Sequence, residues 1–334
     1  MLQTRKICLE NLGAKVSNSA NLLSQSVSDA HLTSSVLMIK PVKFGFNEET
    51  AANNAFQKKG GGAVQDMALE EFNQFVKLLE ANGIDVTVVE DTVSPHTPDS
   101  IFPNNWFSTH ATGELVLYPM CAPNRRRERK ETPLQVIREL GSKGRMNRTL
   151  DLSGREAEER FLEGTGSMVL DRANKIAFVC RSPRSDEDVL SKFCEELDYN
   201  YYYFDAHDRN MSLIYHTNVM MCMGDKFVVA CLDSIRDESE RKTFIEIVKK
   251  CSKEIIDISV EQMEKFAGNM LQLKSQGNES ILVMSSTAKN SLNANQMTAL
   301  EKYCKIIAPD INTIETNGGG SARCMLAELF FMHA

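Results

Sequence analysis

The chain has 334 residues, of which 42% are hydrophobic and 25% charged, a composition typical of a soluble globular protein. Its net charge of −7 argues against a nucleic-acid-binding surface, and no apolar run approaches the ~18 residues of a membrane span. Nine cysteines without a C-x-x-C pair indicate a reducing compartment, and they favour neither a disulfide framework nor a zinc site.

The first 35 residues are polar and rich in Ser and Asn, and we interpret them as an N-terminal extension. A mitochondrial transit peptide would be rich in arginine and poor in acids, whereas Glu10 and Asp29 accompany Arg5 and Lys6 here. We therefore expect a cytoplasmic protein, with mitochondrial targeting by residues 1–35 as the alternative. No low-complexity linker interrupts residues 36–334, so these predict one continuous domain.

The pattern of apolar and polar residues predicts a series of short strands and amphipathic helices. The first unit has a strand at 36–40, a loop at 46–62, a helix at 64–82 and a strand at 84–90. Four later units begin with two strands around a turn, followed by a helix. Their strand pairs are 106–108 with 114–120, 167–170 with 175–180, 219–223 with 226–232 and 270–274 with 280–284. Their helices are 133–140, 186–197, 238–251 and 293–304. The last three units close with strands at 201–204, 254–258 and 311–315.

These units recur with a period on the order of 50 residues, which favours a radial arrangement or an array of like units. The units do not resemble one another in sequence. An ordinary mixed α/β sheet is therefore the alternative interpretation.

The segment 316–327 carries the first candidate for chemistry, because three consecutive glycines precede Cys324. Glycines suit a place where the backbone approaches a ligand or adopts positive φ. The neighbouring Arg323 and nearby backbone N–H groups favour a thiolate, so Cys324 is a candidate nucleophile. The alternative is a flexible loop followed by a buried, inert cysteine.

Two further motifs precede predicted strands. His216 stands directly before the strand at 219–223, where it could act as general acid and base for Cys324. Glu163 precedes two glycines and the strand at 167–170, and it could orient an imidazole. Taken alone, a structural histidine and a solvated glutamate are the simpler interpretations.

Residues 98–110 combine two adjacent amides, the only tryptophan and a histidine. Asp99, Asn105, Trp106 and His110 are candidates for a pocket wall, and a hydrogen-bonded structural corner is the alternative. The basic run 123–130 resembles a solvated face, although one of its arginines could bind a carboxylate bidentately.

These motifs together resemble the guanidino-group-modifying superfamily, the penteins, whose fold is a five-bladed α/β propeller. Glu163, His216 and Cys324 match the superfamily's catalytic residues in type and order. The resemblance runs from about Val36 to the end and is greatest to the arginine deiminase-related citrulline hydrolases. The matching motifs are 44–54, 97–106, 122–126, 216–221 and 318–325.

Two departures from the arginine deiminases concern the substrate. By resemblance, those enzymes hold the guanidinium with two aspartates, at positions that we match to His110 and Asn218. A guanidinium has only donors and suits carboxylates, whereas a neutral ureido group also presents a carbonyl acceptor. The substitutions therefore favour citrulline over arginine.

The resulting prediction is a cysteine hydrolase that converts citrulline to ornithine, ammonia and carbon dioxide without a metal or cofactor. Cys324 attacks, His216 transfers protons, Glu163 orients His216, and Asn218 and His110 donate to the ureido oxygen. By resemblance, Arg125 binds the substrate carboxylate, with Arg184 as the second candidate. A guanidine deiminase, a dimethylarginine-type hydrolase and a non-catalytic propeller are the alternatives. We expect no nucleic-acid or membrane partner, and a homodimer is one alternative for the oligomeric state.

Overall fold

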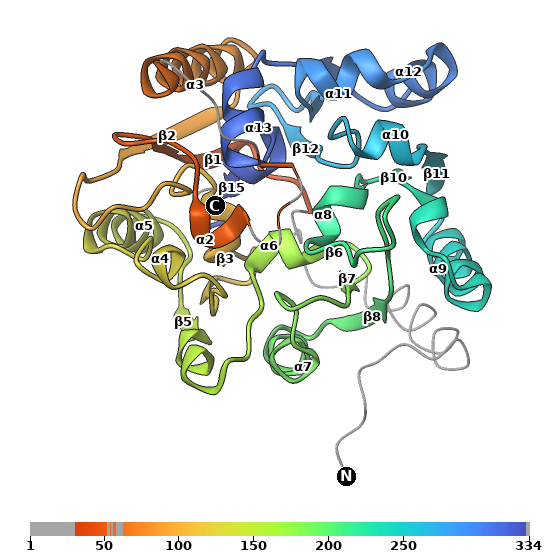
Figure 1. Cartoon of the computed structure of the whole chain (residues 1–334), viewed down its shortest axis with the longest axis horizontal. Helices are drawn as coiled ribbons and strands as arrows, with labels where there is room; N and C mark the ends of the chain where they lie inside the picture. Colours follow the sequence, from red (N-terminus) through yellow and green to blue (C-terminus); the bar gives the residue numbers. More distant parts are fainter. Residues whose placement is uncertain (1–30, 52–53, 55, 58–62, 332–334) are drawn as a thin grey trace.

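The computed structural model describes residues 31–51, 54, 56–57 and 63–331. The predictions for residues 1–30 and for the glycines at 60–62 lie outside these residues. The described part forms five three-stranded sheets, arranged around a common centre in Figure 1. This is the predicted five-unit propeller, and the five-bladed α/β fold is confirmed.

Each sheet follows one plan, in which a middle strand pairs antiparallel with an inner strand and parallel with an outer strand. A helix connects the middle strand to the outer strand, as a parallel crossover requires. In inner, middle and outer order, the strands are β15 (Ala327–Glu328), β1 (Ser35–Lys40) and β2 (Asp85–Glu90); β3 (Phe107–Thr109), β4 (Glu114–Leu117) and β5 (Arg148–Asp151); β6 (Met168–Asp171), β7 (Ile176–Cys180) and β8 (Asn200–Phe204); β9 (Met221–Met223), β10 (Phe227–Ala230) and β11 (Glu254–Asp257); β12 (Leu271–Lys274), β13 (Ser280–Val283) and β14 (Lys305–Ile307).

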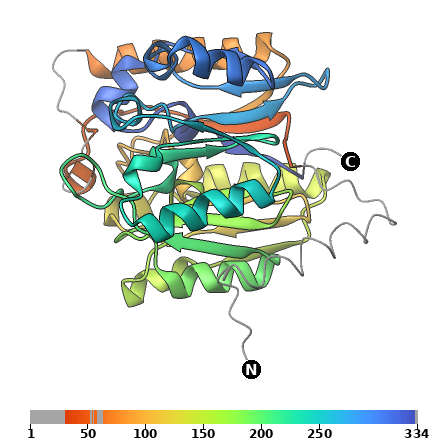
Figure 2. The same cartoon turned by 90° about the vertical axis from the view of Figure 1, so that its right-hand side faces the viewer.

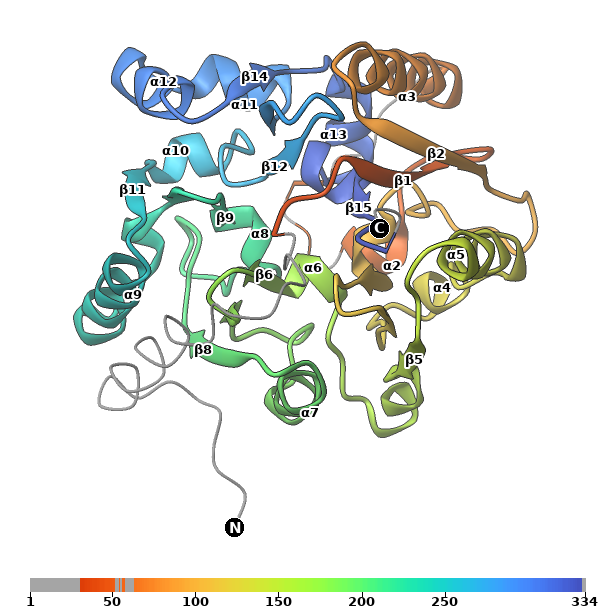
Figure 3. The same cartoon turned by 180° about the vertical axis from the view of Figure 1, so that it is seen from behind.

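The crossover helices lie on the outside of the propeller (Figures 1 and 3). They are α3 (Val64–Ala81), α5 (Glu131–Lys143), α7 (Glu187–Leu197), α9 (Glu238–Lys250), and the pair α11 (Ser286–Ser291) and α12 (Ala294–Glu301). Short elements fill the connections: α2 (Glu48–Ala51), α4 (Pro123–Arg126), α10 (Val260–Met263), η2 (Ser153–Glu158) and η3 (Leu232–Ser234).

Helix α7 shows how the sequence specifies such a crossover. Asp186 caps its first turn by accepting hydrogen bonds from the backbone N–H groups of Asp188 and Val189. Its buried side chains recur at helical spacing and form one apolar face. Within that face Phe193 packs against Tyr199, with ring centroids 5.7 Å apart. A change of Phe193 to Ala would cost about 3–5 kcal/mol of stability.

The first sheet is closed by the far end of the chain. Its inner strand is β15, which pairs with β1 through Val36 opposite Glu328 and Leu37 opposite Ala327. This closure was not predicted, because a two-residue strand carries no local pattern. The outer strand β5 was also missed.

One predicted strand was wrong. Residues 312–315 belong to helix α13 (Asn312–Gly318), Ile311 directly precedes it, and the outer strand of this sheet is instead β14. Ile311 and Ile314 are three residues apart and both fully buried, a helical spacing that we interpreted as a strand. The predicted helix 293–304 accordingly ends earlier, at Glu301.

Candidate active site

Short turns precede the inner strands, and they meet at one end of the propeller. η1 (Pro103–Asn105) leads into β3, α6 (Gly164–Ser167) into β6, α8 (Thr217–Met220) into β9 and η4 (Ala322–Met325) into β15. η1 packs against both α6 and η4, and α6 packs against α8. In the side view, the short red helix α2 lies beyond the same end of the strands (Figure 2). Residues far apart in sequence therefore converge at this end.

The Glu163 carboxylate and the His216 imidazole form the centre of this convergence. Each precedes a four-residue helical turn, and His216 Nε2 lies 2.7 Å from Glu163 Oε2. Burial lowers the pKa of His216 to about 4, although Glu163 opposes the shift. Burial would raise the pKa of Glu163, but Arg184 and the hydrogen bond from His216 hold it well below its usual range. The pair is therefore a neutral imidazole donating from Nε2 to a carboxylate, which leaves Nδ1 as the basic nitrogen.

The glycines after Glu163 are required by this close packing. A Cβ on Gly166 would lie 2.3 Å from Asn105 Nδ2 and 2.9 Å from His216 Nδ1. Gly164 has φ +47°, and a Cβ there would lie 2.4 Å from the Asn104 carbonyl oxygen. The glycines therefore allow Asn105 to lie beside the free nitrogen of His216.

The three glycines before Cys324 have a related role. A Cβ on Gly318 or Gly320 would come within 3 Å of the Phe102 ring, and Gly319 ends α13 with φ +67°. The Gly319 carbonyl oxygen accepts a hydrogen bond from the Tyr215 hydroxyl at 3.3 Å. These contacts join the turn that carries Cys324 to the turn that carries His216.

The Cys324 thiol is 6% exposed and lies between two asparagine side chains. Its Sγ is 3.5 Å from Asn218 Nδ2 and 3.3 Å from Asn269 Nδ2. Asn218 was a predicted site residue. Asn269 was missed, although it occupies the turn before β12 and an alignment of the five units on their inner strands would have identified it.

Asn105 and Asp99 each present an unpartnered atom at this end. Asn105 Oδ1 accepts from Arg125 Nη1 at 2.8 Å, and Asp99 Oδ2 accepts from Asn47 and Thr50. Among the described residues, Asn105 Nδ2, Asp99 Oδ1 and Asn218 Oδ1 are buried without a hydrogen-bond partner. Buried polar atoms without partners are uncommon in folded proteins, so each of these three atoms is available to a ligand.

The two candidate arginines have different surroundings. Arg125 is buried, and its guanidinium forms a bidentate ion pair with Glu128 at 2.8 and 3.0 Å and also donates to the Phe102 carbonyl. Arg184 lies 3.3 Å from Glu163 Oε2, with its guanidinium 4.8 Å from the Tyr215 ring centroid. Arg184 also lines a cleft.

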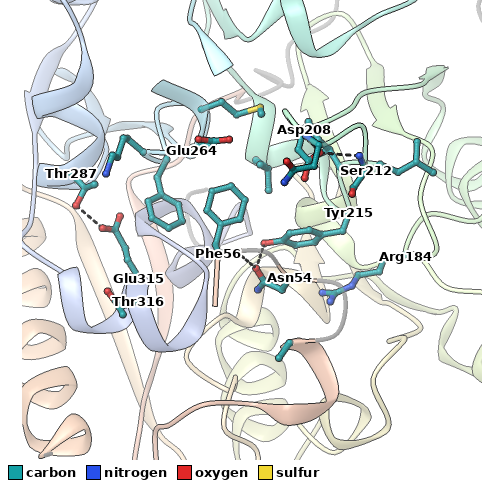
Figure 4. Close-up of a pocket in the computed structure, with 18 of the residues that line it drawn as sticks. Asn54, Phe56, Arg184, Asp208, Ser212, Tyr215, Glu264, Thr287, Glu315 and Thr316 are labelled. Carbon is teal, nitrogen blue, oxygen red and sulfur yellow. Dashed lines mark hydrogen bonds between the residues drawn. The ribbon is translucent and has the colours of Figure 1, made fainter. Parts of the chain in front are cut away.

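That cleft has a volume of about 910 Å³, and its lining includes Val219 of α8 and Thr316 of α13. Figure 4 shows Arg184, Tyr215 and Asn54 on one side, and Glu315, Thr287 and Glu264 toward the other. Tyr215 donates to Asn54 Oδ1 at 3.1 Å, and Phe56 packs against Phe266 across the cleft, with centroids 5.1 Å apart. The cleft is therefore open to a small molecule and has a cationic group on its wall.

The structure does not bring Trp106 and His110 to this place. Trp106 is 1% exposed and packs against Phe107 in the core between the first two sheets. His110 follows the far end of β3, where Nε2 is 2.9 Å from Ser108 Oγ and Nδ1 is 3.3 Å from Arg172 Nη1. Neither residue has a recorded contact with Cys324 or His216.

In the described part of the chain, no group of three or more His, Cys, Asp or Glu side chains is arranged to hold a metal ion. None of the helices described is long and apolar enough to cross a membrane.

Comparison with protein families gives a match that covers most of the chain. Residues 40–331 match the family described as eukaryotic N,N-dimethylarginine dimethylhydrolase. No curated protein sequence gives a match.

Solved structures with the same fold include the following three. The N-terminal domain of ArgZ, an arginine dihydrolase of the ornithine–ammonia cycle in cyanobacteria, is 16% identical with a TM-score of 0.65, over 87% of this chain and 96% of that domain. AgrE in complex with ornithine and NAD⁺ is 17% identical with a TM-score of 0.67, over 90% of this chain but 40% of AgrE. A dimethylarginine dimethylaminohydrolase adduct is 14% identical with a TM-score of 0.63, over 89% of this chain and 100% of the enzyme. At these identities, the likeness shows the fold.

Proposed function

The chain belongs to the eukaryotic N,N-dimethylarginine dimethylhydrolase family, and from this premise we propose that it is a cysteine hydrolase acting on citrulline. The family and the pentein fold support hydrolysis of a guanidine- or urea-type carbon. The choice of citrulline within that class rests on the groups around the thiol.

The choice of citrulline rests on the neutral amide side chains around Cys324. Asn218 and Asn269 are in contact with Sγ, and Asn105 lies beside His216. Arg125 can only donate, so its hydrogen bond to Asn105 fixes Oδ1 toward Arg125 and leaves Nδ2 as a free donor. A ureido oxygen needs such a donor, and the ureido N–H groups need acceptors such as Asn218 Oδ1. A guanidinium has no acceptor for Asn105 Nδ2.

The reaction then proceeds in two covalent steps. The Cys324 thiol gives its proton to His216 Nδ1, and Sγ forms a bond to the ureido carbon as one C–N bond breaks. His216 returns the proton to the departing nitrogen. Water then gives a proton to His216 and replaces sulfur on carbon, His216 returns that proton to the departing Cys324 Sγ, and the resulting carbamic acid decomposes. The sum is citrulline and water giving ornithine, ammonia and carbon dioxide.

Each supporting residue has a defined part in this scheme. Glu163 stabilises the imidazolium that forms on His216, since their 2.7 Å hydrogen bond becomes charge-assisted. Asn105 donates to the ureido oxygen as negative charge develops there. Arg184, on the cleft wall, faces the substrate carboxylate, whereas the pairing of Arg125 with Glu128 suits it to holding Asn105.

A second candidate is hydrolysis of arginine or a methylated arginine. The family match favours it, and so does the buried Asp99, whose unpartnered Oδ1 could pair with a guanidinium. Burial raises the pKa of Asp99 despite the nearby Arg125, which weakens its value as a partner for a cation.

Product analysis separates the two candidates. The purified full-length chain is incubated separately with citrulline, arginine and N,N-dimethylarginine, and amino acids and amines are quantified. Citrulline hydrolysis predicts ornithine and ammonia from citrulline, with no citrulline formed from the other two substrates. Formation of citrulline from arginine or of dimethylamine from dimethylarginine, with citrulline left intact, would refute the proposal.

A further inference from the structure

Asn269 lies in the turn before the inner strand of the fifth sheet, and its side chain joins three parts of the active site. Oδ1 accepts the backbone N–H of Arg323 at 3.1 Å, which holds the turn that carries the nucleophile. Nδ2 donates to the Asn218 carbonyl at 3.1 Å and lies 3.3 Å from Cys324 Sγ. The side chain is 3% exposed, so water does not compete for these contacts.

The orientation of this amide follows from its partners. A backbone N–H can only donate and a backbone carbonyl can only accept. The contact with Arg323 therefore requires Oδ1, and the contact with Asn218 requires Nδ2. The group nearest Sγ is consequently the Nδ2–H donor at 3.3 Å, while Oδ1 lies 3.7 Å from Sγ and can accept only from the protonated thiol. An N–H donor favours a thiolate over a thiol.

A donor at this position has a specific use because positive charge near the thiol is committed elsewhere. Burial keeps His216 neutral by lowering its pKa to about 4. Arg323 directs its guanidinium to the Leu326 carbonyl at 2.8 Å and to Glu328 at 2.9 Å. If the substrate is the citrulline of the proposed function, its neutral ureido group brings no cation to the thiol either. Stabilisation of the thiolate then falls to amide dipoles.

We propose that Asn269 is a catalytic residue whose Nδ2–H stabilises the Cys324 thiolate while its Oδ1 holds the nucleophile turn in place. Asn269→Asp separates these two functions. The aspartate keeps an oxygen for the Arg323 N–H but replaces the donor at Sγ with a second oxygen, which repels a thiolate. The hold of Oδ1 on the nucleophile turn survives this change, whereas donation from Nδ2 to Sγ and to the Asn218 carbonyl is lost, so the pH profile of the thiol is the deciding readout.

The test is the pH dependence of alkylation of Cys324 by iodoacetamide in the full-length protein without substrate. Tryptic cleavage after Arg323 yields a peptide that begins with Cys324, so its labelling is measured separately by mass spectrometry. For Asn269→Asp we expect alkylation at pH 7 to slow at least about tenfold, with the half-maximal rate reached at least about one pH unit higher. Asn290→Asp, an exposed change on α11, is the matched control and should leave the profile unchanged.

Two readouts keep the result interpretable. In turnover, kcat should fall at least about tenfold while KM stays within about threefold, because Asn269 contacts the nucleophile and not the substrate head group. If Asn269→Asp fails to fold, Asn269→Ser provides the same alkylation measurement without added charge. A wild-type alkylation profile in a folded variant would overturn the proposal. Since alkylation needs no substrate, this result is independent of whether citrulline is hydrolysed.

Discussion

The two ends of the inner strands differ in how their buried polar groups are satisfied. At the far end, Glu328 accepts from Arg323 at 2.9 Å and from Arg172 at 3.5 Å, and the Arg172 guanidinium lies 4.1 Å from the Phe330 ring centroid. Among the described residues, none of these charged side chains has a buried polar atom without a partner. The opposite end, which carries the turns η1, α6, α8 and η4, is here called the catalytic end. There, Asp99, Asn105 and Asn218 each have one buried polar atom without a hydrogen-bond partner.

This difference distinguishes buried polar groups that stabilise the fold from those that can bind a ligand. A buried charge that is fully paired can hold strands together, and removing one partner exposes the full cost of burying the other. A buried amide with a free N–H or C=O costs stability unless a ligand completes it. The catalytic end therefore has buried hydrogen-bonding atoms that are available to a ligand, whereas the charged groups named at the far end are paired with one another. The following predictions test this contrast, from the largest expected effect to the smallest.

The largest effect is expected from Cys324→Ala. Turnover should be lost completely, because no other cysteine in the described part lies between donor amides at the convergence of the turns. The fold should be retained, since only one small side chain is removed. Product formation and circular dichroism measure the two outcomes, and turnover within tenfold of wild type would exclude Cys324 as the nucleophile.

Glu163→Gln should reduce kcat by roughly 10²–10⁴-fold, since it removes the charge that stabilises the His216 imidazolium. In the wild type, protonation of His216 removes the base, and its pKa of about 4 places the acid limb of kcat/KM well below pH 6.5. Glu163 raises the His216 pKa, so the variant's acid limb should move to still lower pH.

A pH–rate profile between about pH 3 and 8 measures both effects. Glu195→Gln, an exposed change on α7, is the matched control. An unchanged profile in Glu163→Gln would mean that the carboxylate acts through neither the charge nor the orientation of His216.

The double change Asn105→Asp with Asn218→Asp tests the choice of substrate. It converts the free donor beside His216 into an acceptor and adds two carboxylates, which suit a guanidinium and repel a ureido oxygen. Citrulline hydrolysis should fall at least ~100-fold, equivalent to about 2.7 kcal/mol. Arginine should become a competitive inhibitor or a slow substrate. Near-wild-type citrulline hydrolysis would show that these amides do not contact the ureido group.

Several residues at the catalytic end could be singled out from the sequence alone. Glu163, His216, Asn218 and Cys324 stand beside glycines or before strands, and the structure places all four in the converging turns. Asn269 follows a single glycine in an unremarkable motif. Its position becomes significant only when the five units are aligned on their inner strands.

The fold could be predicted where its pattern is local. Helix periodicity and turn residues reveal each unit, because a crossover helix must bury one face. The closure of the first sheet by β15 depends on residues at opposite ends of the chain, such as Val36 and Glu328. Residues 311–315 were misjudged because two isoleucines suit a strand as well as a helix, and packing of α13 against α3 decides between them.

Glu328→Gln tests the far end of the comparison. It leaves the buried Arg172 and Arg323 without their carboxylate, so the free energy of unfolding should fall by about 3–5 kcal/mol. Chemical denaturation measures this loss. The folded protein should keep kcat within about tenfold, since Glu328 has no contact with the thiol among the described residues. A large loss of turnover without destabilisation would place Glu328 in the catalytic machinery.

The smallest effect on turnover is expected from His110→Gln, which tests the one predicted ureido contact that lies at the far end. His110 contacts Ser108 and Arg172 and packs against Phe193, so KM for citrulline should change less than about twofold while stability falls by about 1–2 kcal/mol.

Burial and the Arg172 charge lower the pKa of His110 well below its ordinary value of 6.5. The unfolded chain therefore binds a proton below about pH 6.5 that the folded protein resists, and wild-type stability is lost as the pH falls, by up to about 1.4 kcal/mol per unit from this group. Glutamine does not titrate, and His216 titrates in both proteins, so the stability gap between variant and wild type should narrow from pH 7 to pH 5. A gap that stays constant, together with a KM raised tenfold or more, would instead place His110 in contact with the substrate.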